Sequence, residues 1–190
     1  MTYELGVDVS KWQTPEKVDW RRLKTESGIQ FVIARYSYGM LIDSTFWRHG
    51  WQAMRVGGIQ LGAYQYLVAN QDAQQQASLA LQVARQLDMP FVLDVEGSGL
   101  TAKHIDTWLN TFQRAKVDAM IYCSQTSWHT CYGRGAHKWA HLPLWVANYT
   151  QANQPAMPDG WETWQIWQHS QNGRLDGYSG AIDLNRRQKK

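Results

Sequence analysis

Eight short segments of the chain are apolar or alternate between apolar and polar residues, and each has the length of a β-strand. They are rich in Val, Ile, Tyr and Trp, which favour strands because their side chains pack well on a pleated sheet. The segments are residues 5–10, 31–39, 60–69, 90–97, 119–125, 143–150, 163–170 and 181–185. The pattern therefore predicts eight strands distributed over the whole chain.

Helical patterns lie between the first six of these segments. Asp19 can cap a helix that ends near Gly28, and Thr101 can cap another whose apolar residues recur every three or four positions. Two more helices are predicted over residues 46–57 and 73–87, where small and apolar residues form one stripe. Residues 126–141 leave room for a short, irregular fifth helix.

The spacing changes after the sixth segment. Residues 151–162 are rich in Pro and Gly, and residues 171–180 are rich in Gly, so neither gap comfortably holds a crossover helix. Five βα units are thus followed by three strands, and short links allow the last strands to pair antiparallel. The sequence predicts an α/β fold, an irregular TIM-like barrel formed by residues 1–185, with a basic tail at residues 186–190.

Composition excludes several classes of protein. With 44% hydrophobic and 18% charged residues the chain is not disordered, and no apolar run approaches the length of a membrane span. The net charge is +3, but four of the positive charges lie in the last five residues. The remainder is nearly neutral, so neither nucleic acid nor stable membrane association is expected, and the tail is interpreted as a solvated end.

The aromatic and cysteine residues indicate which classes of ligand the protein could bind. Eleven Trp and nine Tyr suit either a large core or a groove that stacks against ligand faces, and the neutral body favours sugars over bases. Cys123 and Cys131 are expected to be reduced thiols. Together with His137 and His141 they have the residue types of a zinc site but the wrong spacing, so no metal is predicted there.

The candidate chemistry lies at the ends of predicted strands. Asp94 and Glu96 are two positions apart, so their side chains point to the same face, about 6.6 Å apart along the strand. Asp8 lies on the first strand and Asp183 on the last, which become neighbours when a barrel closes. Each acid alone could have a structural role, but four at one barrel mouth favour a catalytic site.

Clustered carboxylates support two kinds of chemistry. They bind a hard cation such as Mg²⁺, or they hold protons at unequal pKa values and act as acid and base. Glycoside hydrolysis needs the second arrangement, with one protonated acid at the leaving oxygen and one anion near the anomeric carbon. The aromatic content favours a glycosidase, for which no cofactor is required.

Several motifs in order resemble the glycoside hydrolase family 25 lysozymes, the Chalaropsis-type N-acetylmuramidases. The resemblance runs from Gly6 to Asn185 and includes GVDVSKWQ, GAYQYL, FVLDVEG, IYCSQTSW, LWVANY, WQIWQHS and IDLN. It implies a five-βα, three-β barrel that hydrolyses the β-1,4 bond between N-acetylmuramic acid and N-acetylglucosamine in peptidoglycan.

The resemblance also assigns expected roles to individual residues. Glu96 matches the general acid of the family, and Asp94, Asp8 and Asp183 match its other acids. Asp94 is expected to orient the 2-acetamido group of the substrate, which would act as the nucleophile. Tyr64, Tyr66, Tyr122 and Trp145 are candidates for substrate binding, with Tyr64 and Tyr66 equally compatible with the core; Trp12, Trp164 and Trp167 are expected in the core.

The N-terminal sequence MTYELGVDVS has no signal-peptide pattern. We therefore expect a monomeric enzyme of the phage or prophage endolysin type, made in the cytoplasm and released to the cell wall through a holin-type pore. Two alternatives remain open from the residues. One is a wall-binding module that needs the aromatic residues but not Glu96, and the other is a Mg²⁺-dependent hydrolase that uses the same four acids.

Overall fold

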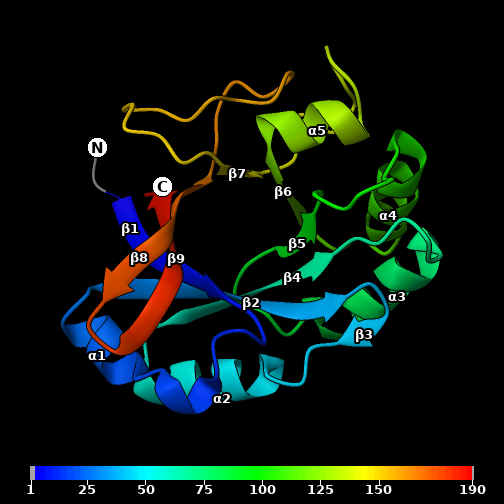
Figure 1. The fold of residues 1–190 in the computed structure, drawn as a ribbon. Helices are drawn as coiled ribbons and strands as arrows, with labels where there is room; N and C mark the ends of the chain where they lie inside the picture. Colours follow the sequence, from blue (N-terminus) through cyan, green and yellow to red (C-terminus); the bar gives the residue numbers. More distant parts are fainter. Residues whose placement is uncertain (1–2, 190) are drawn as a thin grey trace.

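The computed structural model describes residues 3–189, which form strands and helices in alternation (Figure 1). The strands are β1 (Tyr3–Val9), β2 (Ile29–Tyr38), β3 (Leu41–Ile42), β4 (Gln60–Tyr66), β5 (Phe91–Asp94), β6 (Ala119–Ser124), β7 (Leu144–Ala147), β8 (Ile166–Leu175) and β9 (Tyr178–Gln188). The helices are α1 (Trp20–Thr25), α2 (Phe46–Val56), α3 (Ala73–Ala84), α4 (Ala102–Arg114) and α5 (Gln125–Cys131), with a short 3-10 helix at Pro15–Lys17.

Eight of these strands form a closed barrel. The order is β1-β9-β8-β7-β6-β5-β4-β2, with β1 pairing with β2 to close the ring and β3 added outside as a short antiparallel neighbour of β2. Within the ring, all pairs of neighbouring strands are parallel except the two that involve β9. Strand β9 is antiparallel to both β8 and β1. The predicted TIM-like barrel of five βα units and three further strands is confirmed, including its antiparallel end.

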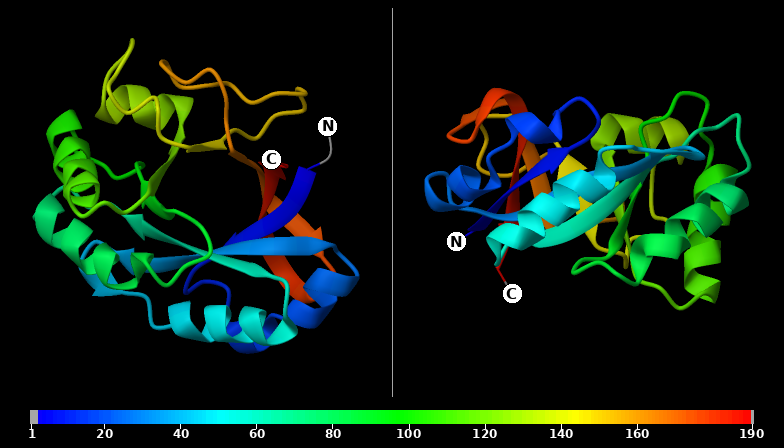
Figure 2. Two further views of the ribbon diagram at one scale, coloured as in Figure 1. Left: turned by 180° about the vertical axis from the view of Figure 1, so that it is seen from behind. Right: turned by 90° about the horizontal axis from the view of Figure 1, so that it is seen from below.

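The helices cover only part of the barrel (Figure 2). Helices α1 and α2 lie against the first strands of the chain, and α3, α4 and α5 lie beside the middle strands. In the described part of the chain, no helix follows β8 or β9. Asp19 caps α1 as predicted, its carboxylate accepting a hydrogen bond from the Arg22 backbone N–H. None of the helices in residues 3–189 has both the length and the apolarity needed to cross a membrane.

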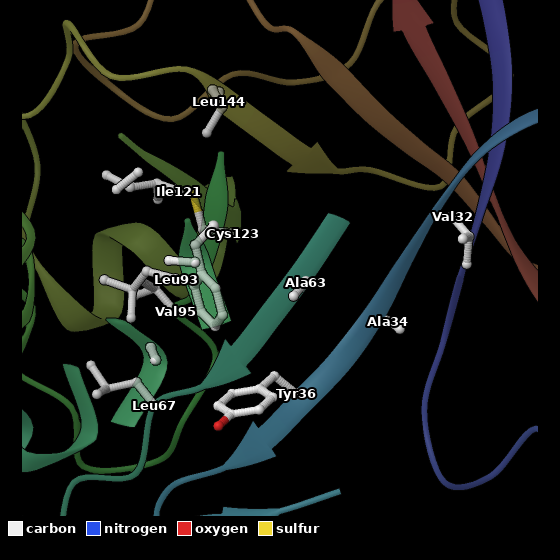
Figure 3. Close-up of a cluster of buried hydrophobic side chains, with 14 of the residues drawn as sticks. Val32, Ala34, Tyr36, Ala63, Leu67, Leu93, Val95, Ile121, Cys123 and Leu144 are labelled. Carbon is white, nitrogen blue, oxygen red and sulfur yellow. The ribbon is translucent and has the colours of Figure 1, made fainter. Parts of the chain in front are cut away.

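Side-chain alternation on the strands divides the core into two layers. Val32 and Ala34 on β2, Leu93 on β5 and Val95 just after it face the helices and belong to the larger cluster (Figure 3). The intervening residues, such as Ile33 and Val92, pack inside the barrel in a smaller cluster. Because Asp94 has the same parity as Val92, its carboxylate points into the barrel, where burial without compensation would be costly.

The last two strands of the barrel, β8 and β9, are longer than the sequence pattern indicated. Residues 171–180, interpreted as a link, are mostly part of β8 and β9, which turn tightly at Gly177 with φ 110°. Polar and glycine residues dominate this hairpin, so no apolar alternation marked it as strand. A two-residue connection at a glycine of positive φ is typical of antiparallel hairpins.

The predicted solvated tail is wrong for residues 186–188, because β9 continues through them. Arg187 pairs with Glu4 of β1, and its guanidinium lies 4.6 Å from the centre of the Phe31 ring. Arg186 lies over the ring of Trp167 at 5.7 Å. The basic residues therefore close the base of the barrel through ion-pair and cation–π contacts rather than extending into solvent.

Among the tryptophans expected in the core, two are buried and one is not. Trp164 and Trp167 are buried, as predicted, whereas Trp12 is 73% exposed. Trp12 lies in the turn that follows β1, beyond the alternation that directs strand residues inward. Lys11 is placed over its ring at 5.0 Å. The prediction for Trp12 is therefore wrong.

Candidate active site

The barrel brings the four predicted acids together at the end where its parallel strands have their carboxyl termini. Asp8 on β1 lies directly opposite Asp183 on β9 in the antiparallel register. Asp94 is the last residue of β5, and Glu96 follows two positions later. All four line one cavity of about 230 Å³, together with Tyr64, Tyr122, Trp145, Tyr149, Gln168 and Gln171. The structure therefore shows that the four acids share one space.

Asp8 is held by side-chain amides from two other strands. Its Oδ2 accepts hydrogen bonds from Gln168 Nε2 on β8 at 2.9 Å and from Asn185 Nδ2 on β9 at 2.8 Å. Burial raises the pKa of Asp8, and the hydrogen bonds from Asn185, Gln168 and Asp183 oppose that rise. These hydrogen bonds thus stabilise the charged form of Asp8 against the larger effect of burial.

Asp183 is placed to hold a proton. Burial raises its pKa most, and the charge of Asp8 and the hydrogen bond between the two carboxyls raise it further, to about 8. At neutral pH the Asp183 carboxyl is therefore mostly protonated and can donate to the Asp8 carboxylate. The two acids share one proton because two adjacent anions would repel each other.

Asp94 and Glu96 form a second coupled pair. Burial, followed by the charges of Glu96 and Asp8, raises the pKa of Asp94 well above its ordinary value. Burial and the charge of Asp8 also raise the pKa of Glu96, while its hydrogen bond with Asp94 lowers it. Among the described residues, Asp94 Oδ1 has no hydrogen-bond partner. Because two adjacent anions would repel each other, this arrangement favours one proton held between the two carboxyls.

A cation on β2 acts on this cluster. The Arg35 guanidinium binds Asp43, with Nη2 and Nε at 2.9 and 3.0 Å from Oδ2, and its charge lowers the pKa of Asp94. The same Asp43 oxygen accepts a hydrogen bond from the Lys11 backbone N–H, which ties the turn after β1 to the segment before α2. Sequence reasoning missed this ion pair because no local motif connects its members.

The predicted substrate-binding aromatics occupy two neighbouring places. Tyr64, Tyr122 and Trp145 line the cavity with the acids. Tyr66 instead stacks on Tyr38, with ring centres 4.6 Å apart, and lines an adjacent hollow of about 500 Å³. This hollow includes Gly97 and Ser98, the two residues that directly follow Glu96 in the chain.

Tyr149, Gln168 and Gln171 also line the cavity, although sequence reasoning did not single them out. Tyr149 and Gln168 fall within the motifs LWVANY and WQIWQHS, which was the one available signal. The Tyr149 hydroxyl donates a hydrogen bond to Gln168 Oε1 at 2.8 Å, which fixes this half-exposed ring at the rim. Amide side chains at strand ends carry no chemical signature comparable with clustered acids.

The proton on Asp183 leads to a prediction about stability. Because folding raises this pKa from its ordinary value of 3.8 to about 8, the group stabilises the fold fully below about pH 4 and loses that contribution as the pH rises through 8. Asp183→Asn keeps a donor toward Asp8 without titrating. Relative to the wild type, the variant is expected to gain stability between pH 5 and pH 9 in urea unfolding. A difference that stays constant over this range, as expected for the exposed control Asp118→Asn, would contradict the assignment.

Comparison with known proteins agrees with this geometry. The family model described as Glycosyl hydrolases family 25 matches residues 7–178. The chain belongs to glycosyl hydrolase family 25. The predicted family and the prediction of a glycoside hydrolase are therefore confirmed.

Relatives of this family 25 enzyme span nearly all of its sequence. It is 35% identical to the uncharacterized protein YegX of Escherichia coli O6:H1, over 95% of this chain and 68% of that protein. It is 30% identical to Lysozyme M1 of Streptomyces globisporus, over 95% of this chain and 66% of that protein. The crystal structure of a bacterial lysozyme from Streptomyces coelicolor superposes with a TM-score of 0.85 at 28% identity, covering 100% of this chain and 94% of that one.

Proposed function

We propose that this family 25 enzyme is a peptidoglycan muramidase that hydrolyses the β-1,4 bond from N-acetylmuramic acid to N-acetylglucosamine, with Glu96 as general acid and base. The observation that carries the proposal is the cavity in which Glu96 and Asp94 lie beside the Asp8–Asp183 pair. Similarity to Lysozyme M1 and to the bacterial lysozyme of Streptomyces coelicolor supports the substrate class.

Glu96 is suited to protonate the leaving oxygen. Burial and the charge of Asp8 raise the pKa of its carboxyl. The carboxyl can therefore hold a proton at a higher pH than a glutamate in free solution. As the bond between C1 and the glycosidic oxygen breaks, that proton passes to the oxygen of the departing sugar. Glu96 is left as the carboxylate, which is the form needed to activate water in the next step.

Asp94 is suited to assist the 2-acetamido group. In the first step the acetamido carbonyl oxygen forms a bond to C1 while the amide N–H donates to Asp94, giving an oxazolinium ion. In the second step Glu96 takes a proton from water, the water oxygen attacks C1, and the acetamido group is released. The sugar configuration is retained because C1 is attacked twice from opposite faces.

Substrate binding also places the shared proton. In the free enzyme, Asp94 and Glu96 are joined by a hydrogen bond. An amide N–H donated by the substrate to Asp94 favours the anionic form of Asp94, since hydrogen bonds to a carboxylate stabilise its charge. The proton is then left on Glu96, beside the glycosidic oxygen. The substrate thereby converts the resting pair into an acid and an anion.

The aromatic residues and the biological setting complete the proposal. Tyr64, Tyr122 and Trp145 would contact the sugars in the cavity, and Tyr66 would contact a neighbouring sugar at the adjacent hollow. The enzyme would act as a monomer on the bacterial cell wall. Synthesis in the cytoplasm and release through a holin-type pore, as in a phage or prophage endolysin, remain predictions.

Digestion of purified peptidoglycan tests the proposed function. The expected products carry a muramic acid at the new reducing end, identified by mass spectrometry, and their yield is expected to be the same with and without EDTA. A glucosamine reducing end would overturn the bond specificity. Loss of activity in EDTA would support the Mg²⁺-dependent hydrolase, and binding to peptidoglycan without cleavage would support the wall-binding module.

A further inference from the structure

The two amides that bind Asp8 are themselves locked in orientation. Asn185 is 1% exposed, and its Oδ1 accepts a hydrogen bond from Trp145 Nε1 at 2.8 Å. An indole N–H can only donate, so the amide oxygen of Asn185 must face Trp145 and its NH₂ group must face Asp8. Asp8 therefore meets a donor at this position whatever its own protonation state.

Gln168 repeats the arrangement from the neighbouring strand. It is 3% exposed, and its Oε1 accepts hydrogen bonds from the hydroxyls of Tyr122 and Tyr149 at 2.9 and 2.8 Å. With its oxygen occupied by two donors, its NH₂ group is directed at the same Asp8 oxygen that Asn185 contacts. Two buried amides thus converge on one carboxylate oxygen from β8 and β9.

We propose that Gln168 and Asn185 are positioning residues that hold Asp8 as the fixed anion of the site and, through its charge, keep the catalytic proton on Glu96. The inference rests on the proposed function of Glu96 as the acid. Hydrogen bonds from neutral donors stabilise the charged form of a carboxylate, and this stabilisation is large in a buried site. Asp8 Oδ2 accepts hydrogen bonds from two amide donors, whereas Asp94 Oδ1 has no hydrogen-bond partner among the described residues.

The charge of Asp8 reaches the other acids of the cavity. It raises the pKa of Glu96, Asp94 and Asp183, in each case as a contribution after burial. Loss of the Asp8 charge would therefore release protons from its neighbours at lower pH. Among the described residues, the other titratable groups that line this space are Tyr64 on β4, Tyr122 on β6 and Tyr149 after β7, and the charge of Arg35 on β2 acts on Tyr64 and Asp94.

The pH dependence of turnover tests this role. In Gln168→Met and, separately, in Asn185→Leu, Asp8 loses a donor and takes up a proton more readily. Its charge then no longer supports the proton on Glu96, so the alkaline limb of the kcat profile is expected to move to lower pH by on the order of one unit. Gln65→Met is the matched control, since Gln65 is also a buried strand glutamine, hydrogen-bonded to Trp108, Ser37 and the Gly39 carbonyl, but faces the helices.

A second measurement does not depend on turnover. Carbon-13 NMR titration of the Glu96 side-chain carboxyl is expected to show a lower pKa in Gln168→Met and Asn185→Leu, and no change in Gln65→Met. In an Asp8→Asn background, adding Gln168→Met is expected to produce no further shift, because the charge that it controls is already absent.

The outcomes separate this inference from the proposed function. A wild-type enzyme that fails to release muramic acid ends would overturn the proposed function, whereas the NMR titration would still report on the amides. Reduced kcat at every pH with both limbs and the Glu96 pKa unchanged would show a purely structural role for Gln168 and Asn185. A shift of equal size in Gln65→Met would also overturn the inference, because it would reflect general destabilisation.

Discussion

Glu96→Gln is expected to lower the rate of peptidoglycan hydrolysis by on the order of 10²–10⁴-fold, the usual contribution of a general acid and base. Glutamine has almost the same shape but has no acidic proton to give to the glycosidic oxygen and cannot accept one from water. The effect is expected in kcat rather than in KM, because the side chain acts on the bond that breaks and not on the bulk of the sugar.

The measurement is the initial rate of release of reducing ends at saturating substrate, with the fold checked by circular dichroism and urea unfolding. Glu162→Gln is the matched control, because Glu162 is exposed in the segment before β8 and does not line the cavity. Its rate is expected to equal that of the wild type. A Glu96→Gln enzyme that retains more than about a tenth of the wild-type rate would contradict the assignment of Glu96 as the acid.

Asp94→Asn is expected to lower kcat by on the order of 10²–10³-fold, the loss typical of one electrostatic contact to a developing charge. The positive charge of the oxazolinium ion forms beside this side chain, and asparagine offers a neutral amide in place of an anion. The substitution also removes the partner that exchanges a proton with Glu96, so the pH profile is expected to change together with the rate.

Intact-protein mass spectrometry distinguishes this mechanism from one with a protein nucleophile. With the acetamido group as nucleophile, no covalent glycosyl-enzyme is expected for the wild type or for Asp94→Asn, Asp8→Asn and Asp183→Asn. The mechanism would be wrong if Asp94→Asn kept near-normal rates while Asp8→Asn accumulated a glycosyl adduct. Asp94 as the nucleophile is tested in the same spectra, since an adduct would form on the wild-type enzyme and disappear in Asp94→Asn.

The acids could be predicted from sequence because their positions follow from simple periodicities. Residues two apart on a strand share a face, which places Asp94 and Glu96 together, and closure of the barrel places Asp8 beside Asp183. The observed register pairs Asp8 with Asp183 directly. The order of the eight barrel strands was accessible for the same reason, since apolar alternation and gap lengths encode it locally, whereas the two-residue strand β3 was not predicted.

The partners of those acids could not be predicted in this way. Gln168 and Asn185 contact Asp8 across 160 and 177 positions, and an amide in a strand has no distinctive pattern before the barrel is built. Trp12 was misplaced because a tryptophan in a turn cannot be told from a buried one by its type alone. The continuation of β9 through Arg186 and Arg187 was missed because their anchoring contacts come from Trp167, Glu4 and Phe31.

The antiparallel pairing of β1 with β9 joins the first and the last strand of the barrel, which are synthesised at different times. A nascent polypeptide emerges N-terminus first, so Asp8 is available early, while Asp183 and Asn185 are the last parts of the cavity to leave the ribosome. Until then Asp8 lacks two of its partners, and the barrel has an open seam between β1 and β8. Hydrolytic activity is therefore expected only once β9 has docked between β1 and β8, so the onset of catalysis would report that the last strand of the barrel is in place.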